Sequence, residues 1–291
     1  MMNELSNDEK IECDHLLQAI FLKYGYDFRN YSKSSMRRHI YNRLSRYNLK
    51  TFSEMQNTVL HDKQFFEKLL MDMTINVTEM FRDPNFFKMF RKCVIPDLKK
   101  KPFVKIWHAG CSSGEEVYSM AILLREEGFR NFRVYASDMN EAVIHKAKKG
   151  VFPIAKMKGY TRNYREAGGH ASFADYYTAR YDFAIVDSTL RKNITFFHHN
   201  LVNGEIFGEM DLIVCRNVLI YLDKNLQNRV FNLFFESLSP GGYLCIGSKE
   251  TVRFSTCSDR FADVVREEKI YRKNDFSSIH LNSELLLPVK T

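Results

Sequence analysis

The sequence predicts an α/β protein in which a Rossmann-like domain follows an all-α N-terminal domain. Up to about residue 98, apolar residues recur at the three- and four-residue spacing of amphipathic helices. From residue 99, short β-rich runs alternate with amphipathic helices, a pattern typical of a parallel sheet with helices on both faces. An aromatic-rich stretch over about 151–192 interrupts this alternation and is too long for an ordinary connection. We therefore expect domains over 1–98 and 99–274, a small inserted β-subdomain and a loose tail over 275–291.

The first domain contains three recognisable helical patterns. Two apolar stripes lie over 16–21 and 65–73, and a third helix is expected to begin with Ser34 and Ser35 as caps. The stripe of this third helix comprises Met36, Ile40, Leu44 and Tyr47. A separate basic face, which we expect to remain in solvent, comprises His39, Arg43, Arg46 and Lys50.

The second domain is expected to contain five strands and three helices before a final hairpin arm over 262–272. Strands are predicted over 104–110, 133–138, 194–198, 211–215 and 243–247. Helices are predicted over 115–127, 141–149 and 226–238, the last ended by Ser239-Pro240-Gly241-Gly242.

Composition limits the class of protein. The 291 residues, 45% of them hydrophobic, suffice for a large core and a smaller accessory domain. No run of about 18 apolar residues and no signal peptide is evident, so we expect a soluble cytoplasmic protein without membrane insertion. Six cysteines form no C-x-x-C pair, and the histidines show no metal-ligand spacing. The cysteines are interpreted as reduced thiols, and no metal site is predicted.

The net charge of +8 is compatible with nucleic acid, an anionic membrane or an acidic protein partner. Seven basic residues and no acidic one occur from Arg29 to Lys50. This stretch is a local basic patch, which either binds an acidic partner or is merely solvated.

A glycine loop follows the first predicted strand. Gly110 to Gly114 lie where the strand turns into a helix, so a ligand can approach the backbone and the free N–H groups of the helix. The next strand ends at Asp138, whose carboxylate can accept both hydroxyls of a ribose or can cap the following helix. No Walker lysine follows the loop, and Glu115 and Glu116 would repel a pyrophosphate but accept an ammonium group. The pattern favours S-adenosylmethionine.

Three motifs resemble the chemotaxis receptor methyltransferase family, CheR, and occur in the family's order. They are Asn76-Val77-Thr78-Glu79-Met80-Phe81-Arg82, Gly114-Glu115-Glu116-Val117-Tyr118-Ser119 and Cys215-Arg216-Asn217-Val218-Leu219-Ile220-Tyr221. The likeness extends from about Tyr24 to Lys273. It implies a class I S-adenosylmethionine-dependent methyltransferase domain with an inserted β-subdomain, which esterifies glutamate side chains of a chemoreceptor.

The resemblance also assigns residues to the cofactor. Asn76, Thr78 and Arg82 are expected over it, Glu116 and Glu115 at its methionine part, and Asp138 at its ribose. Other expected cofactor contacts are Gly110, Met139, Asn200, Leu201, Arg216 and Asn217. Tyr221 is expected near the transferred methyl group, and Arg82 is the candidate for holding a carboxylate. Alternatively, Asn76 and Thr78 cap the next helix, while Asn217 and Tyr221 satisfy turn and core hydrogen bonds.

The basic face of His39, Arg43, Arg46 and Lys50 suits acidic receptor helices by charge. The sequence departs from the family pattern at Met80, at Gly247-Ser248-Lys249-Glu250 and in the insertion, so contact between the insertion and a receptor tail stays open. The sequence is also compatible with two other functions. An RNA methyltransferase would use the basic patch, but no nucleic-acid docking motif is present. An adaptor that binds the cofactor without turnover would also retain these residues.

Overall fold

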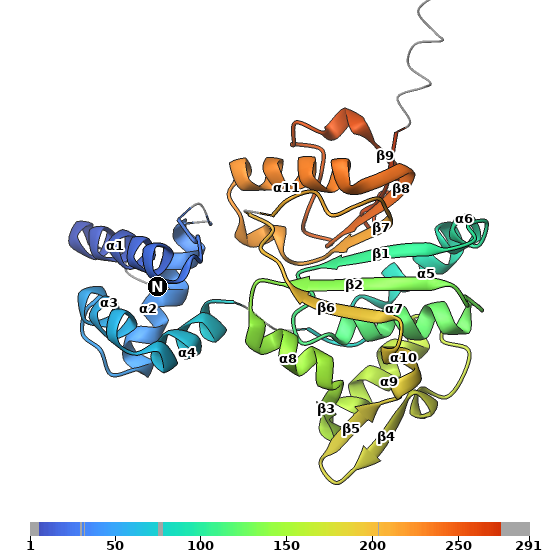
Figure 1. Cartoon of the computed structure of the whole chain (residues 1–291), viewed down its shortest axis with the longest axis horizontal. Helices are drawn as coiled ribbons and strands as arrows, with labels where there is room; N and C mark the ends of the chain where they lie inside the picture. Colours follow the sequence, from blue (N-terminus) through green and yellow to red (C-terminus); the bar gives the residue numbers. More distant parts are fainter. Residues whose placement is uncertain (1–5, 30, 32, 75–77, 203, 275–291) are drawn as a thin grey trace, which may run out of the picture.

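The computed structural model describes residues 6–29, 31, 33–74, 78–202 and 204–274, which form a helical lobe and a sheet lobe (Figure 1). The helical lobe consists of α1 (Asn7–Tyr24), α2 (Lys33–Arg46), α3 (Phe52–His61) and α4 (Lys63–Met73). Its core is built from the predicted apolar stripes, including Leu16, Ile20, Ile40 and Leu69, each at most 1% exposed. A capping box between Ser6 and Glu9 begins α1.

The sheet lobe starts with two helices and then alternates strands and helices. Its first half comprises α5 (Pro84–Cys93), α6 (Ile95–Leu98), β1 (Val104–Ala109), α7 (Glu115–Glu126), β2 (Phe132–Asp138) and α8 (Glu141–Lys149). Its second half comprises β6 (Ile194–His198), β7 (Met210–Cys215), α11 (Lys224–Ser237), β8 (Leu238–Ile246), β9 (Phe261–Val265) and β10 (Ile270–Lys273). The predicted fold class is confirmed.

Seven strands form one sheet in the order β6-β2-β1-β7-β8-β10-β9. β6, β2, β1, β7 and β8 pair in parallel, while β10 and β9 add an antiparallel hairpin at one side. Successive residues of β1 point to opposite faces, so Val104 and Ile106 enter the core under α5 and α7, whereas Trp107 and Ala109 enter the core under α11. All four are at most 2% exposed, which is why this strand reads as a nearly continuous apolar run.

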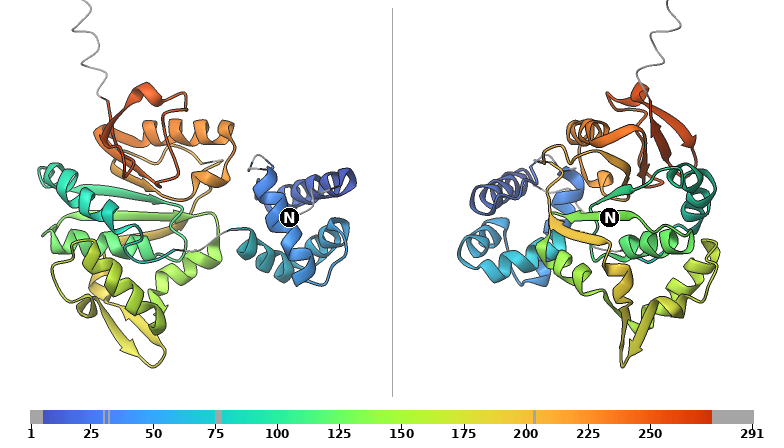
Figure 2. Two further views of the ribbon diagram at one scale, coloured as in Figure 1. Left: turned by 180° about the vertical axis from the view of Figure 1, so that it is seen from behind. Right: turned by 45° about the vertical axis from the view of Figure 1, so that its right-hand side comes forward.

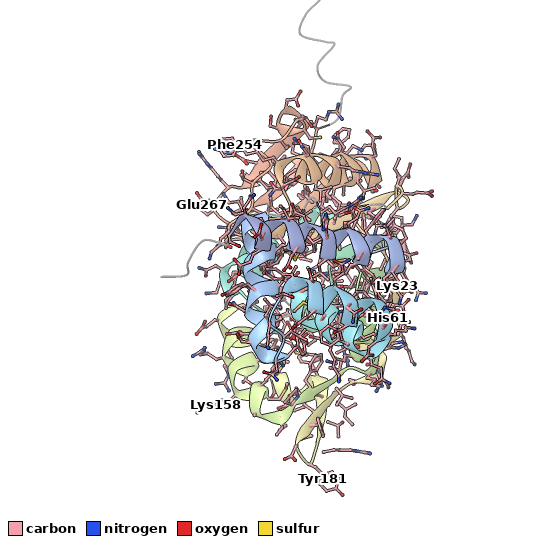
Figure 3. All side chains as sticks on the ribbon, turned by 90° about the vertical axis from the view of Figure 1, so that its left-hand side faces the viewer. Lys23, His61, Lys158, Tyr181, Phe254 and Glu267 are labelled. Carbon is pink, nitrogen blue, oxygen red and sulfur yellow. The ribbon has the colours of Figure 1, made fainter. Side chains whose placement is uncertain are left out.

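The insertion forms a small sheet that projects from the sheet lobe in every view (Figures 1 and 2). Its strands are β3 (Val151–Pro153), β4 (Tyr177–Arg180) and β5 (Phe183–Val186), antiparallel in the order β3-β5-β4. It also contains the helices α9 (Met157–Glu166) and α10 (Ser188–Arg191), which the sequence reading did not specify. Tyr181 lies at its outer tip and is 99% exposed (Figure 3).

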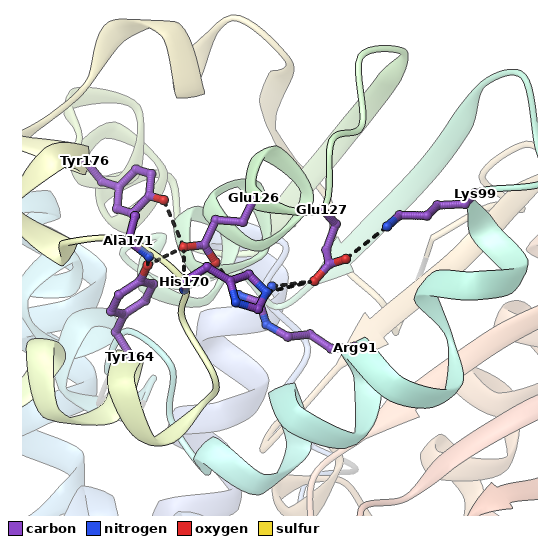
Figure 4. Close-up of polar contacts among 8 residues, drawn as sticks. All are labelled: Arg91, Lys99, Glu126, Glu127, Tyr164, His170, Ala171 and Tyr176. Carbon is purple, nitrogen blue, oxygen red and sulfur yellow. Dashed lines mark hydrogen bonds and ion pairs between the residues drawn. The ribbon is translucent and has the colours of Figure 1, made fainter.

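A buried ionic cluster attaches this insertion to the rest of the lobe (Figure 4). The Glu126 carboxylate, 4% exposed, accepts hydrogen bonds from the hydroxyls of Tyr164 and Tyr176 and pairs with Arg91. The other arm of the Arg91 guanidinium donates to Glu127 at 2.7 Å. Arg91 of α5 therefore binds the end of α7. The Glu126 carboxylate in turn binds the two tyrosines of the insertion, so all three parts are joined.

Two local expectations were wrong. α2 begins at Lys33, so Ser34 and Ser35 lie inside its first turn instead of capping it. The helix expected over 226–238 is α11 (Lys224–Ser237), and the stretch 239–242 continues as the start of β8. Leu238 already pairs with Met210, and an irregular register there accommodates the two glycines.

The basic face of α2 is not a free solvent face. Arg43 Nε lies 3.3 Å from Asp72 Oδ2, and Arg46 Nη1 lies 2.8 Å from Asp72 Oδ1, so both arginines attach α2 to α4. Lys50 follows the end of the helix and is exposed. The side chain of His39 and the residues of the predicted tail lie outside the described part of the structure.

No helix within the described ranges is long and apolar enough to cross a membrane.

Replacing Arg91 by Met should destabilise the fold by about 3 kcal/mol at pH 7, because two carboxylates would lose a buried partner. Burial raises the pKa of Glu126, but hydrogen bonds from Tyr164, Arg91 and Tyr176 outweigh it, so the pKa falls below its usual 4.5. A carboxyl group whose pKa is lower in the folded than in the unfolded protein stabilises the fold at pH values above its unfolded pKa. This contribution is lost as the pH falls through the folded pKa. The difference in the free energy of unfolding between R91M and wild type, measured by urea titration, should therefore become smaller below about pH 4.5.

Lys63→Met is the matched control, because Lys63 pairs with Glu67 on the surface, where both side chains are at least 60% exposed. Its unfolding should be close to wild type at both pH values. Equal stability of R91M and wild type at pH 7 would contradict a stabilising role of the cluster.

Candidate functional site

The site is built where the parallel strands end. β2, β1 and β7 are neighbours, so their carboxyl ends and the segments that follow meet at one edge of the sheet. Gly110 follows β1 with φ of 79°, and its N–H and that of Cys111 both donate to Ser137 O at 2.8 Å. A side chain at Gly110 would place its Cβ 2.5 Å from Val218 Cγ2, so only glycine lets these two loops approach.

A cavity of about 130 Å³ lies at this edge. Most of the predicted site residues line it. They are Thr78, Arg82, Gly110, Glu116, Asp138, Met139, Asn200, Leu201, Arg216, Asn217 and Tyr221. Asn76 lies outside the described residues. His39, Arg43, Arg46 and Lys50 are not among the residues that line the cavity.

Asp138 organises the glycine loop. Its Oδ2 accepts from the Ser112 N–H at 2.8 Å and its Oδ1 from the Asn140 N–H at 2.9 Å, while the residue as a whole is 9% exposed. Burial raises the pKa of this carboxyl group, and the hydrogen bonds from the backbone N–H groups of Asn140 and Ser112 act against the rise. The carboxylate therefore lies at the cavity wall with one oxygen directed at each flanking turn.

Arg216 joins three chain segments beneath the cavity. Its Nη1 lies 2.5 Å from Glu116 Oε2, its Nη2 lies 2.7 Å from Asp83 Oδ2, and its guanidinium stacks 4.1 Å from the Phe86 ring centroid. Its Nη1 also donates to the backbone oxygen of Arg82 at 3.4 Å. A buried arginine that follows β7 therefore contacts the backbone at Arg82, a residue that also lines the cavity.

Glu115 does not line the cavity. It is 2% exposed and turns towards the insertion, where its carboxylate accepts from Ser113 Oγ at 2.6 Å and lies 3.7 Å from Lys156 Nζ. Adjacent helical residues point about 100° apart, so only Glu116 of the pair reaches the cavity. The capping alternative for Thr78 is wrong, since α5 begins at Pro84 with Asp83 as its N-cap residue.

Arg82 and Tyr221 reach the same cavity from the two sides of the site. Burial raises the pKa of Tyr221, so the phenol is neutral. The positive charge of Arg82 acts against that rise, which shows that the guanidinium lies close enough to interact with the phenol. Tyr221 belongs to the short 3₁₀ helix η3 (Leu219–Tyr221), which follows β7. The Arg82 guanidinium and the Tyr221 hydroxyl are among the groups that a carboxylate entering the cavity would meet.

The helical lobe supplies a wall that sequence reasoning missed. Its lining residues are Phe28, Tyr31, Met36, Met73 and Thr74. Tyr31 forms an antiparallel bridge with Leu222 and donates from its hydroxyl to the sulfur of Met139 at 3.4 Å. Asn140 Nδ2 donates to Thr74 Oγ1 at 3.0 Å. These contacts join residues about 70 to 190 positions apart in the sequence, so no local pattern could have indicated them.

Two further polar residues near the cavity were not predicted. His108 ends up 1% exposed beside Glu116 and Arg216, and burial followed by the charge of Arg216 lowers its pKa to about 3, so the imidazole is neutral. Its Nε2 has no hydrogen-bond partner in the described structure. Glu250 lies beyond β8, and its carboxylate accepts from backbone N–H groups of Asn217, Leu219 and Ile220. Within the described chain no cluster of metal-ligating side chains occurs.

The fold and the site together define a class I methyltransferase with a glycine loop, an acidic residue at a strand end and a wall supplied by the helical lobe. The model of the CheR methyltransferase SAM-binding domain matches residues 76–269, and that of the CheR all-alpha domain matches residues 11–74. The chain therefore belongs to the CheR methyltransferase family. It is an S-adenosylmethionine-dependent enzyme of a family that esterifies protein glutamates.

Named relatives agree with this assignment. A Pseudomonas putida protein with the provisional name methyltransferase Cher3 is 50% identical over 275 residues, which cover 94% of this chain and 100% of that protein. A chemotaxis protein methyltransferase of Listeria monocytogenes is 31% identical over 247 residues, 83% of this chain and 91% of the relative. Chemotaxis protein methyltransferase 2 of Vibrio cholerae is 31% identical over 192 residues, covering 62% of this chain and 64% of the relative.

The residues present suit S-adenosylmethionine. Glu116 offers a carboxylate to an ammonium group, Asp138 faces the cavity at the end of β2, and Gly110 leaves room beside Val218. Ser112 Oγ and His108 Nε2 are buried without a hydrogen-bond partner among the described residues, although both residues line the cavity. Such polar atoms are commonly satisfied by a ligand or water.

Gly110→Ala should weaken binding of S-adenosylhomocysteine at least tenfold, measured by titration calorimetry. The new Cβ would lie 2.5 Å from Val218 Cγ2, and alanine is strained at a φ of 79° by about 1–2 kcal/mol. Gly159→Ala is the matched control, because its Cβ would meet nothing within 4 Å and the residue lies in α9. That variant should bind like wild type and gain stability. Unchanged affinity in G110A would show that the two loops need not touch.

Proposed function

We propose that this chain transfers the methyl group of S-adenosylmethionine to glutamate side chains of a chemoreceptor's acidic cytoplasmic helices, as part of signal adaptation in the cytoplasm. The observation that carries the proposal is the convergence of Arg82 and Tyr221 on the cavity that also holds Glu116 and Asp138. The relatives named chemotaxis protein methyltransferases support the pathway.

Bound cofactor supplies a methyl group already activated on a sulfonium. In this proposal Glu116 receives its ammonium group and Asp138 its ribose hydroxyls. Thr78, Met139, Asn200, Leu201 and Asn217 complete the walls, and Gly110 lets the cofactor approach the backbone. Asn76 is proposed as a further cofactor contact. Arg216 contributes by holding Glu116, because its guanidinium is already paired.

The acceptor needs orientation more than activation. A glutamate has an ordinary pKa of about 4.3 and is ionised at neutral pH, so no general base has to remove a proton. Arg82 would draw the carboxylate into the cavity, and the Tyr221 hydroxyl would donate to the oxygen that is not methylated. Orientation of this kind can lower a barrier by several kcal/mol.

Arg82→Ala should lower methyl transfer at least 100-fold, because the acceptor carboxylate loses its cation. The assay supplies methyl-labelled S-adenosylmethionine and membranes that carry the receptors of the source organism. The label should release methanol in mild base, since methyl esters hydrolyse and N-methyl groups do not. Arg130→Ala is the control, because this exposed arginine precedes β2 at the opposite edge of the sheet.

Three results would contradict the proposal. Base-stable label on protein would exclude a glutamate ester. Label in RNA would revive the nucleic-acid function, and cofactor binding without any transfer would favour an adaptor. Turnover of R82A like that of R130A would remove Arg82 from the mechanism.

The basic side of the helical lobe is proposed to receive the acidic substrate. Arg43 and Arg46 hold Asp72, so their replacement by glutamate would disturb the lobe itself. Arg46 is nevertheless 60% exposed at its side chain and Lys50 is exposed, so both still face solvent. The insertion is the second candidate contact, for a receptor tail.

The double variant Arg46→Gln and Lys50→Gln removes two charges without adding an acid. We expect the KM for the acidic substrate to rise about five- to tenfold at low salt and the difference to shrink at high salt. Affinity for S-adenosylhomocysteine should stay unchanged. Lys63→Gln with Lys68→Gln, two exposed lysines of α4, is the charge-matched control. An equal rise of KM in both double variants would show a general charge effect instead of a docking face.

A further inference from the structure

Glu250 is a buried carboxylate devoted to backbone amides. It follows β8 by four residues and is 5% exposed. Its Oε2 accepts from the N–H of Gly247 at 2.5 Å and of Asn217 at 3.2 Å. Its Oε1 accepts from the N–H of Leu219 at 2.8 Å and of Ile220 at 3.3 Å. One side chain thus satisfies four donors that would otherwise need other partners in the interior.

Three of these donors belong to the segment 216–222 that forms one wall of the cavity. Asn217, Val218 and Tyr221 of this segment line the cavity. The segment has little regular structure of its own, because η3 has three residues and Asn217 adopts a φ of 61°. Asparagine adopts a positive φ more readily than most residues, and with so little regular structure the segment depends on contacts with other elements to keep its conformation.

The turn that carries Glu250 fits closely against this segment. The Glu250 N–H donates to Gly247 O at 2.9 Å, which closes a turn over 247–250. A Cβ at Gly247 would lie 2.8 Å from the backbone nitrogen of Asn217, so the two backbones are in direct contact. Gln227 supports the far end of the segment, since its Nε2 donates to the backbone oxygens of Leu219 and Leu222.

No cation neutralises this carboxylate. Among the described residues Glu250 takes part in no ion pair, and burial raises its pKa while the backbone N–H groups of Gly247, Asn217 and Leu219 act against the rise. A buried charge without a counter-ion costs several kcal/mol, which hydrogen bonds offset only in part. Such a carboxylate adds little to the stability of the fold. A role in holding a functional conformation explains its presence better.

We propose that Glu250 is a positioning residue for methyl transfer, whose carboxylate holds the segment 216–222 so that Asn217 and Tyr221 face the cofactor and the acceptor. Glu250 acts only through this segment, since it does not line the cavity itself. The proposal deepens the proposed function and rests on it for the role of Tyr221.

Glu250→Gln keeps the size of the side chain and replaces one acceptor oxygen by an amide that cannot accept. Two of the four N–H groups lose their partner, so we expect hydrogen exchange of the peptide 216–222 to accelerate at least tenfold. The kcat should fall about 10- to 100-fold, and the Kd of S-adenosylhomocysteine should rise several-fold. The substrate KM should stay within about threefold of wild type, because the basic face of α2 is untouched.

Glu126→Gln is the matched control. Glu126 is also a buried carboxylate with several donors, but it lies ten residues beyond Glu116 on α7, about 15 Å further from the cavity. This variant should lose stability and keep wild-type kcat and cofactor affinity at a temperature where it is folded. Glu250→Asp retains the charge on a shorter side chain, so its kcat should lie between those of wild type and E250Q.

A folded E250Q protein with wild-type exchange, Kd and kcat would overturn the proposal. So would a kcat loss of the same size in E126Q, because it would reflect stability alone. Failure of the proposed function is a separate result. If wild type binds S-adenosylhomocysteine but methylates no receptor, receptor methylation is refuted, and the exchange and Kd of E250Q still decide whether Glu250 anchors the cavity wall.

Discussion

The parallel pairing of β1 with β2 and with β7 is the constraint on which the site depends. Ile106 lies between Val134 and Leu212 in this register, so the three strands end at one edge of the sheet. The glycine loop, Asp138 and the segment after Cys215 are therefore neighbours, although the chain between the first and the last spans about a hundred residues. A shift in this register would separate the three strand ends.

Buried charges then fix the loops that the strands bring together. Asp138 holds the turn after β1, Glu250 holds the segment after β7, and Arg216 connects that segment to Glu116 and to the linker at Asp83. Each group binds atoms that belong to another element, so the loops order one another. The helical lobe completes the enclosure through Tyr31 and Thr74, and its described lining residues carry no charged side chain.

The sequence was sufficient wherever a local pattern determines the structure. The strand over 194–198, most of the strand expected over 104–110 and the helix over 141–149 follow from apolar period and turn residues. The glycine loop and Asp138 were expected at a ligand because they follow strands, whereas Asn200, Leu201, Arg216 and Asn217 were expected there from the resemblance to the family. Glu115 could not be separated from Glu116, because which one faces the cavity depends on how the glycine loop enters α7. Arg43 looked solvated because its partner, Asp72, lies on another helix. The cavity wall from the helical lobe and the hydrogen bonds of Glu250 depend on tertiary contacts, which leave no periodic pattern in the sequence.

A reaction with an activated donor and an ionised acceptor leaves little chemistry for acids and bases, and the distribution of carboxylates in this chain agrees with that. His108 is neutral and buried, and Tyr221 keeps its proton. Asp138 and Glu250 accept hydrogen bonds from backbone N–H groups and do not serve as general bases. Buried ionisable groups are expensive, so their use as anchors indicates that geometry is what this site has to maintain. Asp138, Glu250 and Arg216 hold the loops that form the cavity walls.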